Sequence, residues 1–250
     1  MNAQRIIQIL ILLAAVGTGI YLVNATGSDD PNLADKQNPN STNSTTNVSY
    51  EMLKHIDEAI HAQENNKDVR CWSSVNKIQM FLSNMPIESE AIGQRVESYV
   101  EMIDSVWKEA STDKTEAPEI SKASLLSVLQ SRFPHSIDSE TSETKFDFAG
   151  RSDLSLTIEE EAVDDYSDTI EGWRLLQSWA QRKTDAKGNL TLKPTFSKEA
   201  IIAFRDFLVR YDIALLKNAK NVAMTDKVPK VDVETMKKAF DQLQNMRQKD

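Results

Sequence analysis

The chain has few of the residues on which disulfide-rich and turn-rich folds depend. Its 250 residues include one cysteine, seven glycines and seven prolines. A single cysteine excludes an intrachain disulfide framework and any zinc or iron–sulfur site that needs several cysteine ligands. The scarcity of glycine argues against a turn-rich β-sandwich. With 40% hydrophobic and 27% charged residues, the composition is that of a folded protein and excludes wholesale disorder.

Short catalytic motifs are also missing. The sequence contains no P-loop, no glycine-rich dinucleotide-binding pattern, no HExxH, no GxSxG and no CxxC. Ser74 and Lys77 match the S-x-x-K pattern of serine acyl-transferring enzymes, but the S-D-N and K-T-G elements that accompany it are lacking. The sequence designates no catalytic residue, and a non-catalytic function is the leading expectation.

Acidic residues are concentrated in the first two thirds of the chain. Residues 28–170 contain 28 acidic and 12 basic side chains, whereas residues 171–250 contain 10 acidic and 16 basic ones. Such an asymmetry indicates either a charged interaction surface or two parts that attract each other within one molecule. The second interpretation requires no outside partner and is preferred.

The strongest single signal is the uncharged run at residues 6–23. A helix of this length rises about 27 Å, which is close to the hydrocarbon thickness of a bilayer. Arg5 precedes the run and Asp29 and Asp30 follow it, so the positive-inside rule places residues 1–5 in the cytoplasm and the rest of the chain beyond the membrane. A cleaved signal peptide ending near Ala25 is the competing interpretation. Both predict export, and the length of the run favours an uncleaved single-pass anchor in contact with membrane lipid.

Residues 24–48 are predicted to form a flexible linker. The segment is almost wholly Asn, Ser, Thr and Pro in its second half, so it has little to bury. Asn40, Asn43 and Asn47 fit the N-x-[ST] pattern, which would accept glycans in a eukaryotic secretory protein.

The remainder is predicted to be mainly α, a helical-bundle domain with a small β-hairpin insert. Residues 49–115 form a three-helix acidic subdomain, whose first helix begins at Ser49 and whose second ends at Pro86. The third helix carries an apolar stripe at helical spacing, formed by Ile92, Val96, Tyr99, Ile103 and Val106.

Residues 119–250 form an α-rich subdomain with basic C-terminal helices. Ser121, Ser197 and Asp232 are expected to cap helices, and residues 159–182 to form another. Apolar and polar residues alternate on both sides of Gly150, which predicts a β-hairpin over 144–158 with residues 190–192 as a third strand.

One candidate metal site lies on the first predicted helix. Glu51, His55 and Glu58 share a helix face by their spacing and can offer three ligands to a divalent metal. That face lies opposite the apolar stripe, so a solvated surface is the preferred interpretation. No cofactor is predicted.

A second candidate is the acidic run that begins at residue 159. Its carboxylates, among them Glu161, Asp164, Asp165 and Asp168, can bind calcium or supply a general acid and base. Acidic residues also favour the first turn of a helix, where they complement the helix dipole, and this interpretation is preferred.

Residues 197–240 resemble the second half of a histone fold. The resemblance consists of a long helix, a connection containing Val228, Lys230 and Val231, and a last helix opened by Asp232. It implies DNA binding or dimerisation, but it covers under a fifth of the chain, and an exported chain does not meet chromosomal DNA. Nucleic acid is therefore not the expected partner.

These observations predict a membrane-tethered extracytoplasmic binding or scaffolding protein with a protein partner. The alternative is an extracytoplasmic hydrolase or lyase that uses the acidic cluster or a single metal. The remote alternative is a basic, histone-fold-like nucleic-acid module.

Overall fold

The computed structural model describes residues 44–65, 78, 81–112, 119–146, 148, 156, 163, 166 and 170–245. The chain divides into two units, Met1–Thr42 and Asn43–Asp250. The first unit, with the predicted anchor at 6–23, lies outside the described residues. Among the residues that are described, no helix is long and apolar enough to cross a bilayer.

The described part is mainly helical, which confirms the predicted fold class at this level. The helices are α2 (Ser44–Asn65), α4 (Ser89–Thr112), α5 (Lys122–Arg132), α7 (Glu171–Gln181), α8 (Lys198–Thr225) and α9 (Val233–Gln244). Four short strands accompany them.

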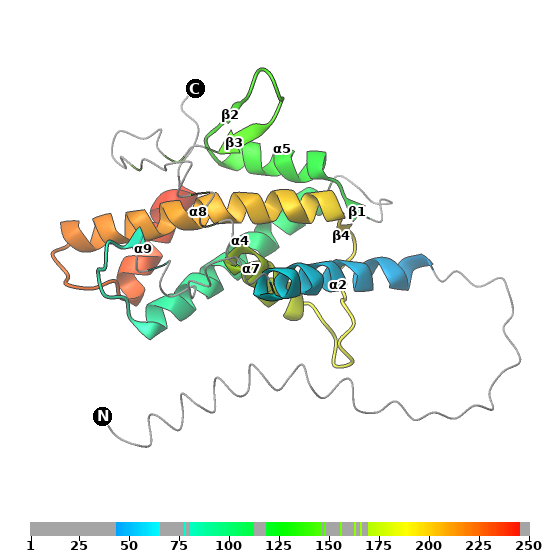
Figure 1. Ribbon diagram of the computed structural model, residues 1–250, viewed down its shortest axis with the longest axis horizontal. Coiled ribbons are helices and arrows are strands. Elements are labelled where there is room, and N and C mark those ends of the chain that lie inside the picture. Colours follow the sequence, from blue (N-terminus) through cyan, green and yellow to red (C-terminus); the bar gives the residue numbers. More distant parts are fainter. Residues whose placement is uncertain are drawn as a thin grey trace, which may run out of the picture. The chain divides into compact units, whose positions relative to one another are not determined.

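Helix α8 is surrounded by the rest of the domain, with α5, α7 and α9 packed against it (Figure 1). Residues 211–216 are all buried. Six consecutive residues cover the whole circumference of a helix, because each turns by about 100°. The middle of α8 is therefore in contact with protein on every side.

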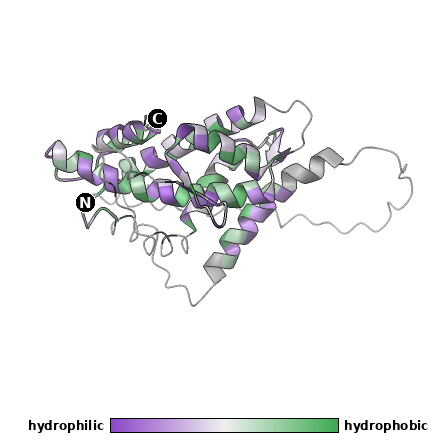
Figure 2. Ribbon diagram, turned by 90° about the horizontal axis from the view of Figure 1, so that it is seen from above, coloured by the Kyte–Doolittle hydropathy of each residue, from purple (hydrophilic) through white to green (hydrophobic). Residues whose placement is uncertain are grey.

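One hydrophobic core includes residues from both predicted subdomains. Tyr99 and Ile103 of α4 belong to the same cluster as Phe204 and Leu208 of α8. Helix α4 packs against α5, α7 and α9. Purple and green residues share the same helices in Figure 2, as expected for amphipathic helices around a common interior. The boundary drawn between 49–115 and 119–250 does not separate two cores.

Three helix starts follow the predicted caps. The side chains of Ser121, Ser197 and Asp232 accept hydrogen bonds from the backbone N–H groups three residues later. Helix α2, in contrast, begins at Ser44. It thus includes the last residues of the segment 24–48 that was predicted as linker.

An antiparallel hairpin forms at residues 135–146 and shares residues 144–146 with the hairpin predicted over 144–158. Strand β2 (His135–Ile137) pairs antiparallel with β3 (Thr144–Phe146), and His135 faces Phe146 in the register. The prediction had β3 as the first strand of a hairpin over 144–158. The turn is built by Asp138, whose carboxylate accepts the N–H groups of residues 140 and 141, rather than by a glycine. Most of the predicted second strand lies outside the described residues.

The predicted third strand does not join this hairpin. Leu190 instead makes an isolated bridge with Thr184. A separate parallel pair forms between β1 (Glu119–Ile120) and β4 (Thr195–Phe196), in which Ile120 faces Phe196. Both of these side chains are buried in the core, so the pairing is stabilised by packing across a long stretch of sequence.

Helix α7 begins at Glu171, after a bend at Ile170 that interrupts the helix predicted over 159–182. Val163 and Tyr166, the two residues described between 159 and 169, are helical as predicted. Ile170 has no side-chain oxygen to cap the helix. The start of α7 is instead fixed by tertiary contacts of Glu171, which belong to the site described next.

Candidate functional site

Three helices bring charged side chains together inside the domain. Arg95 comes from α4, Glu171 from the first position of α7, and Asp212 from the middle of α8. Their exposed fractions are 0% for Arg95, 8% for Glu171 and 1% for Asp212. Charges at this depth are strongly unfavourable unless they are paired and hydrogen-bonded.

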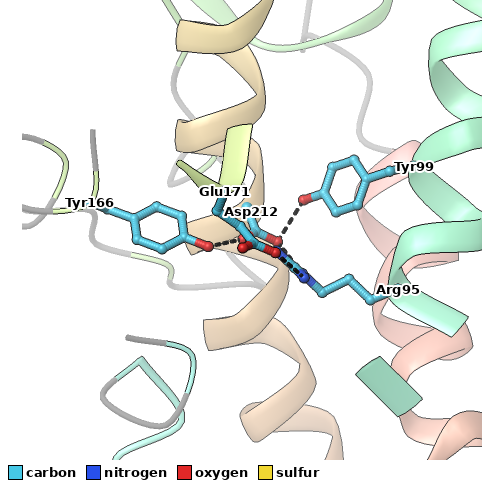
Figure 3. Close-up of polar contacts among 5 residues, drawn as sticks. All are labelled: Arg95, Tyr99, Tyr166, Glu171 and Asp212. Carbon is cyan, nitrogen blue, oxygen red and sulfur yellow. Dashed lines mark hydrogen bonds and ion pairs between the residues drawn. The ribbon is translucent and has the colours of Figure 1, made fainter. Parts of the chain in front are cut away.

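The Arg95 guanidinium is bonded through all three of its nitrogens. Its Nε and Nη2 donate to Oδ1 and Oδ2 of Asp212 over 2.7 and 2.6 Å, which is a bidentate pair. Its Nη1 donates to Oε1 of Glu171 over 2.9 Å. Figure 3 shows the guanidinium extended toward both carboxylates.

Two tyrosines complete the network. The hydroxyl of Tyr99 on α4 donates to Oδ1 of Asp212 over 2.9 Å, and the hydroxyl of Tyr166 donates to Oδ2 (Figure 3). The Arg95 guanidinium also lies 5.7 Å from the centre of the Tyr99 ring. Each oxygen of Asp212 thus accepts two hydrogen bonds, so this carboxylate has no acceptor position left for a ligand.

The shifted pKa values of Arg95 and the two tyrosines keep these groups protonated, so that they remain hydrogen-bond donors. Burial alone lowers the pKa of Arg95, but the carboxylates of Asp212 and Glu171 outweigh burial and raise it well above its usual value. Burial, followed by the negative charge of Asp212, raises the pKa values of Tyr99 and Tyr166 well above the ordinary tyrosine value. Both hydroxyls therefore stay protonated donors, and the network joins α4, α7 and α8.

Removing either tyrosine hydroxyl tests the contribution of these donors. We expect Tyr99→Phe to lower the free energy of unfolding by about 1–3 kcal/mol, because a buried carboxylate loses a hydrogen bond. Urea denaturation of the full-length protein in detergent measures this change. Tyr211→Phe is the matched control, since its buried hydroxyl bonds to Gln244 and not to the network. An equal loss in the control would contradict a special role for Asp212.

Sequence reasoning missed these residues, although two of them carried a signal. Arg95 precedes Tyr99 by four positions, so it lies on the same face of the predicted apolar stripe. Asp212 is the only charged residue in the otherwise apolar or aromatic segment 211–216. A charged residue on a buried face indicates a partner, but the sequence did not show which one.

The candidate metal ligands on α2 are not gathered around one point. Glu51 and Glu58 are exposed, and Oε1 of Glu58 lies 3.7 Å from Nζ of Lys54. His55 is half-buried, and its ring meets the Trp173 ring edge-on at a centroid distance of 5.9 Å. Within the described ranges, no group of three or more His, Cys, Asp or Glu side chains is placed to hold a metal ion.

The position of His55 predicts a dependence of stability on pH. Burial, followed by the positive charge of Lys198, lowers the pKa of His55 below its usual 6.5, against the opposing effect of Glu58 and Glu199. The unfolded chain therefore binds a proton at a higher pH than the folded chain does. The stabilising contribution is complete above about pH 7 and is lost as the pH falls through the ordinary histidine value and then through the lowered one. His55→Gln should therefore flatten the dependence of the unfolding free energy on pH over this window, as measured by urea denaturation at a series of pH values. An unchanged slope would contradict this prediction.

The remaining sequence candidates cannot be placed. Glu161, Asp164, Asp165 and Asp168 lie outside the described residues, as do Cys71, Ser74 and Lys77. The third histidine, His135, lies in β2 with its Nδ1 3.2 Å from the backbone oxygen of Phe133.

No protein family, curated protein or solved structure matches this chain. The assignment of a function therefore depends on the chain's own residues.

The two oppositely charged parts of the chain meet on its surface. Arg182 and Lys183, at the end of α7, pair with Glu97 and Asp104 of α4. Lys230 pairs with Glu88, just before α4. In each pair the acid comes from the acidic part of the sequence and the base from the basic part, which agrees with attraction within one molecule.

Proposed function

We propose that the chain is a membrane-tethered, extracytoplasmic binding or scaffolding module with a protein partner. The observation that carries the proposal is the buried Arg95–Asp212–Glu171 network. The Arg95 guanidinium bonds to carboxylates from two other helices inside the domain, so the network fixes the positions of three helices. A fixed arrangement of helices suits a protein that works by presenting helix faces.

The membrane tether of this proposal rests on the sequence. The uncharged run at residues 6–23 has the length of a bilayer-spanning helix, and Arg5 lies on its N-terminal side. A periplasmic or lumenal reporter fused after Ala25 is expected to be active, and the native protein should resist extraction by alkaline carbonate. Activity of the reporter in the cytosol alone would refute the predicted topology.

Photo-crosslinking in intact membranes tests the binding function. A photoreactive amino acid is placed in the full-length chain at exposed positions on different helices, Glu101 of α4 and Lys237 of α9, with buried Leu208 as control. We expect a discrete adduct from at least one exposed position and none from Leu208. Capture should survive high salt, because the charged pairs found on the surface lie within the molecule. Adducts at no exposed position would overturn the proposal.

A further inference from the structure

Helix α2 is held differently from the helices around the network. It packs mainly against α7 and β4, through Met52, Ile56 and Ile60, which follow one another at four-residue spacing and are buried. Its polar contacts to α7 include the hydrogen bond from Gln177 Nε2 to Asp57 Oδ1, at 2.8 Å. Figure 1 shows α2 beside α7.

Polar atoms in this interface lack partners, in contrast to those of the network. His55 Nε2 is buried beside Trp173 without a hydrogen bond. Thr195 Oγ1, on the strand that α2 contacts, is also buried and unbonded. An unsatisfied buried polar atom costs free energy that is recovered when the atom reaches water. These two unbonded atoms therefore reduce the free energy gained when α2 docks. The network among α4, α7 and α8 carries no such cost at Asp212, whose oxygens are all hydrogen-bonded.

The surface under α2 has a defined chemistry. Trp173 and Gln177 are four residues apart on α7, so they lie on one face of that helix. Trp173 also contacts Arg205 of α8, whose guanidinium lies 5.6 Å from the ring centre. Detachment of α2 would leave an aromatic and amide surface ready for a helix with aliphatic residues at four-residue spacing.

We propose that α2 is a detachable strap, and that α2 of a second copy of the chain takes its place on α7 and β4, so that two copies exchange these helices. The one helix known to fit this surface is α2 itself, and every copy carries it. Exchange of an identical element needs no new complementary surface. The inference rests on the proposed function, since it names a second copy as the partner.

Intermolecular cross-linking of two full-length variants in detergent tests the exchange. Both carry Cys71→Ser, one carries Asp57→Cys, and the other carries Gln177→Cys. The two are mixed and treated with a short bismaleimide. We expect a species of twice the chain mass that is absent when either variant is treated alone. A single chain carrying both cysteines is the positive control and should become linked, within one copy where α2 is docked on its own chain and between two copies where α2 is exchanged.

Two matched substitutions complete the test. Ile56→Ala should weaken intermolecular linking, because an apolar contact of α2 is shortened, whereas Glu58→Ala on the exposed face should leave it unchanged. No double-mass species, in a reaction where the doubly substituted chain is linked only within itself, would overturn the exchange. Adducts with other proteins in intact membranes would then still support the proposed function, and the absence of such adducts would refute that function separately.

Discussion

Arg95→Ala is expected to lower the free energy of unfolding by about 3–5 kcal/mol, because it leaves buried carboxylates without their counter-charge. Asp212, 1% exposed, would keep only the tyrosine donors, and Glu171 would lose its hydrogen bond from Nη1. Urea denaturation of the full-length protein, followed by tryptophan fluorescence, gives the difference.

Arg182→Ala is the matched control for this prediction. Arg182 also pairs with a carboxylate, that of Glu97, but on the surface. Surface pairs of this kind contribute about 0–1 kcal/mol, because water screens them and the side chains lose freedom on pairing. If Arg95→Ala costs no more than Arg182→Ala, the buried network does not stabilise the fold as described.

A combined variant separates stability from function in the same network. Arg95→Met, Glu171→Met and Asp212→Leu, together with Tyr99→Phe and Tyr166→Phe, remove the charges and their donors at once. Replacing a whole buried ionic cluster with apolar groups is often neutral, so much of the stability lost in Arg95→Ala should return. A combined variant that folds and still captures the partner shows that the network acts only by holding the helices.

The helices were the predictable part of this fold. The starts of α5, α8 and α9 follow from Ser121, Ser197 and Asp232, because a cap is a local interaction between a side chain and the next turn of backbone. The apolar stripe of α4 was equally local. Such features depend on residues three or four apart, which the sequence displays directly.

The strands and the network were not predictable, because they depend on residues far apart in the chain. The β1–β4 pair joins Glu119 to Thr195, and no local pattern indicates which two-residue segments will meet. The hairpin turn uses the Asp138 side chain, a weaker signal than the Gly150 that drew the prediction to 144–158. Arg95 lies within the predicted third helix, but only the fold shows that Asp212 and Glu171 lie opposite it.

Helix α7 takes part in two contrasting interfaces, and this contrast connects the fold to the proposed function. At its first residue, Glu171, α7 is fixed to α4 through Arg95, in the network that also binds α8. Two and six residues later, at Trp173 and Gln177, it supports α2 in an interface where polar atoms lack partners. The network holds α4, α7 and α8 together, whereas the α2 interface contains unbonded polar atoms. This difference allows α2 to detach while the rest of the domain stays folded.

Phe207→Ala is the second substitution for which we expect a large effect, a loss of about 3–5 kcal/mol in the free energy of unfolding, because it opens a cavity in the aromatic core. Phe207 is 1% exposed and lies where α8, the end of α5 and the hairpin meet. Its ring contacts those of Phe133, Phe146, Phe148, Phe204 and Tyr211.

The same substitution should also loosen the β2–β3 hairpin, which shows whether the ring supports that element. Phe146 of β3 has its ring centre 4.9 Å from that of Phe207, and a two-stranded hairpin is marginal in water without such packing. Hydrogen exchange at the backbone amides of β2 and β3 should therefore accelerate more than exchange within α9. Ile202→Ala, at a 40% exposed position of the same helix, is the control and should change the unfolding free energy by no more than about 0.5 kcal/mol. A Phe207→Ala protein that unfolds like the control, or whose hairpin amides exchange as before, would show that the hairpin is held by other contacts.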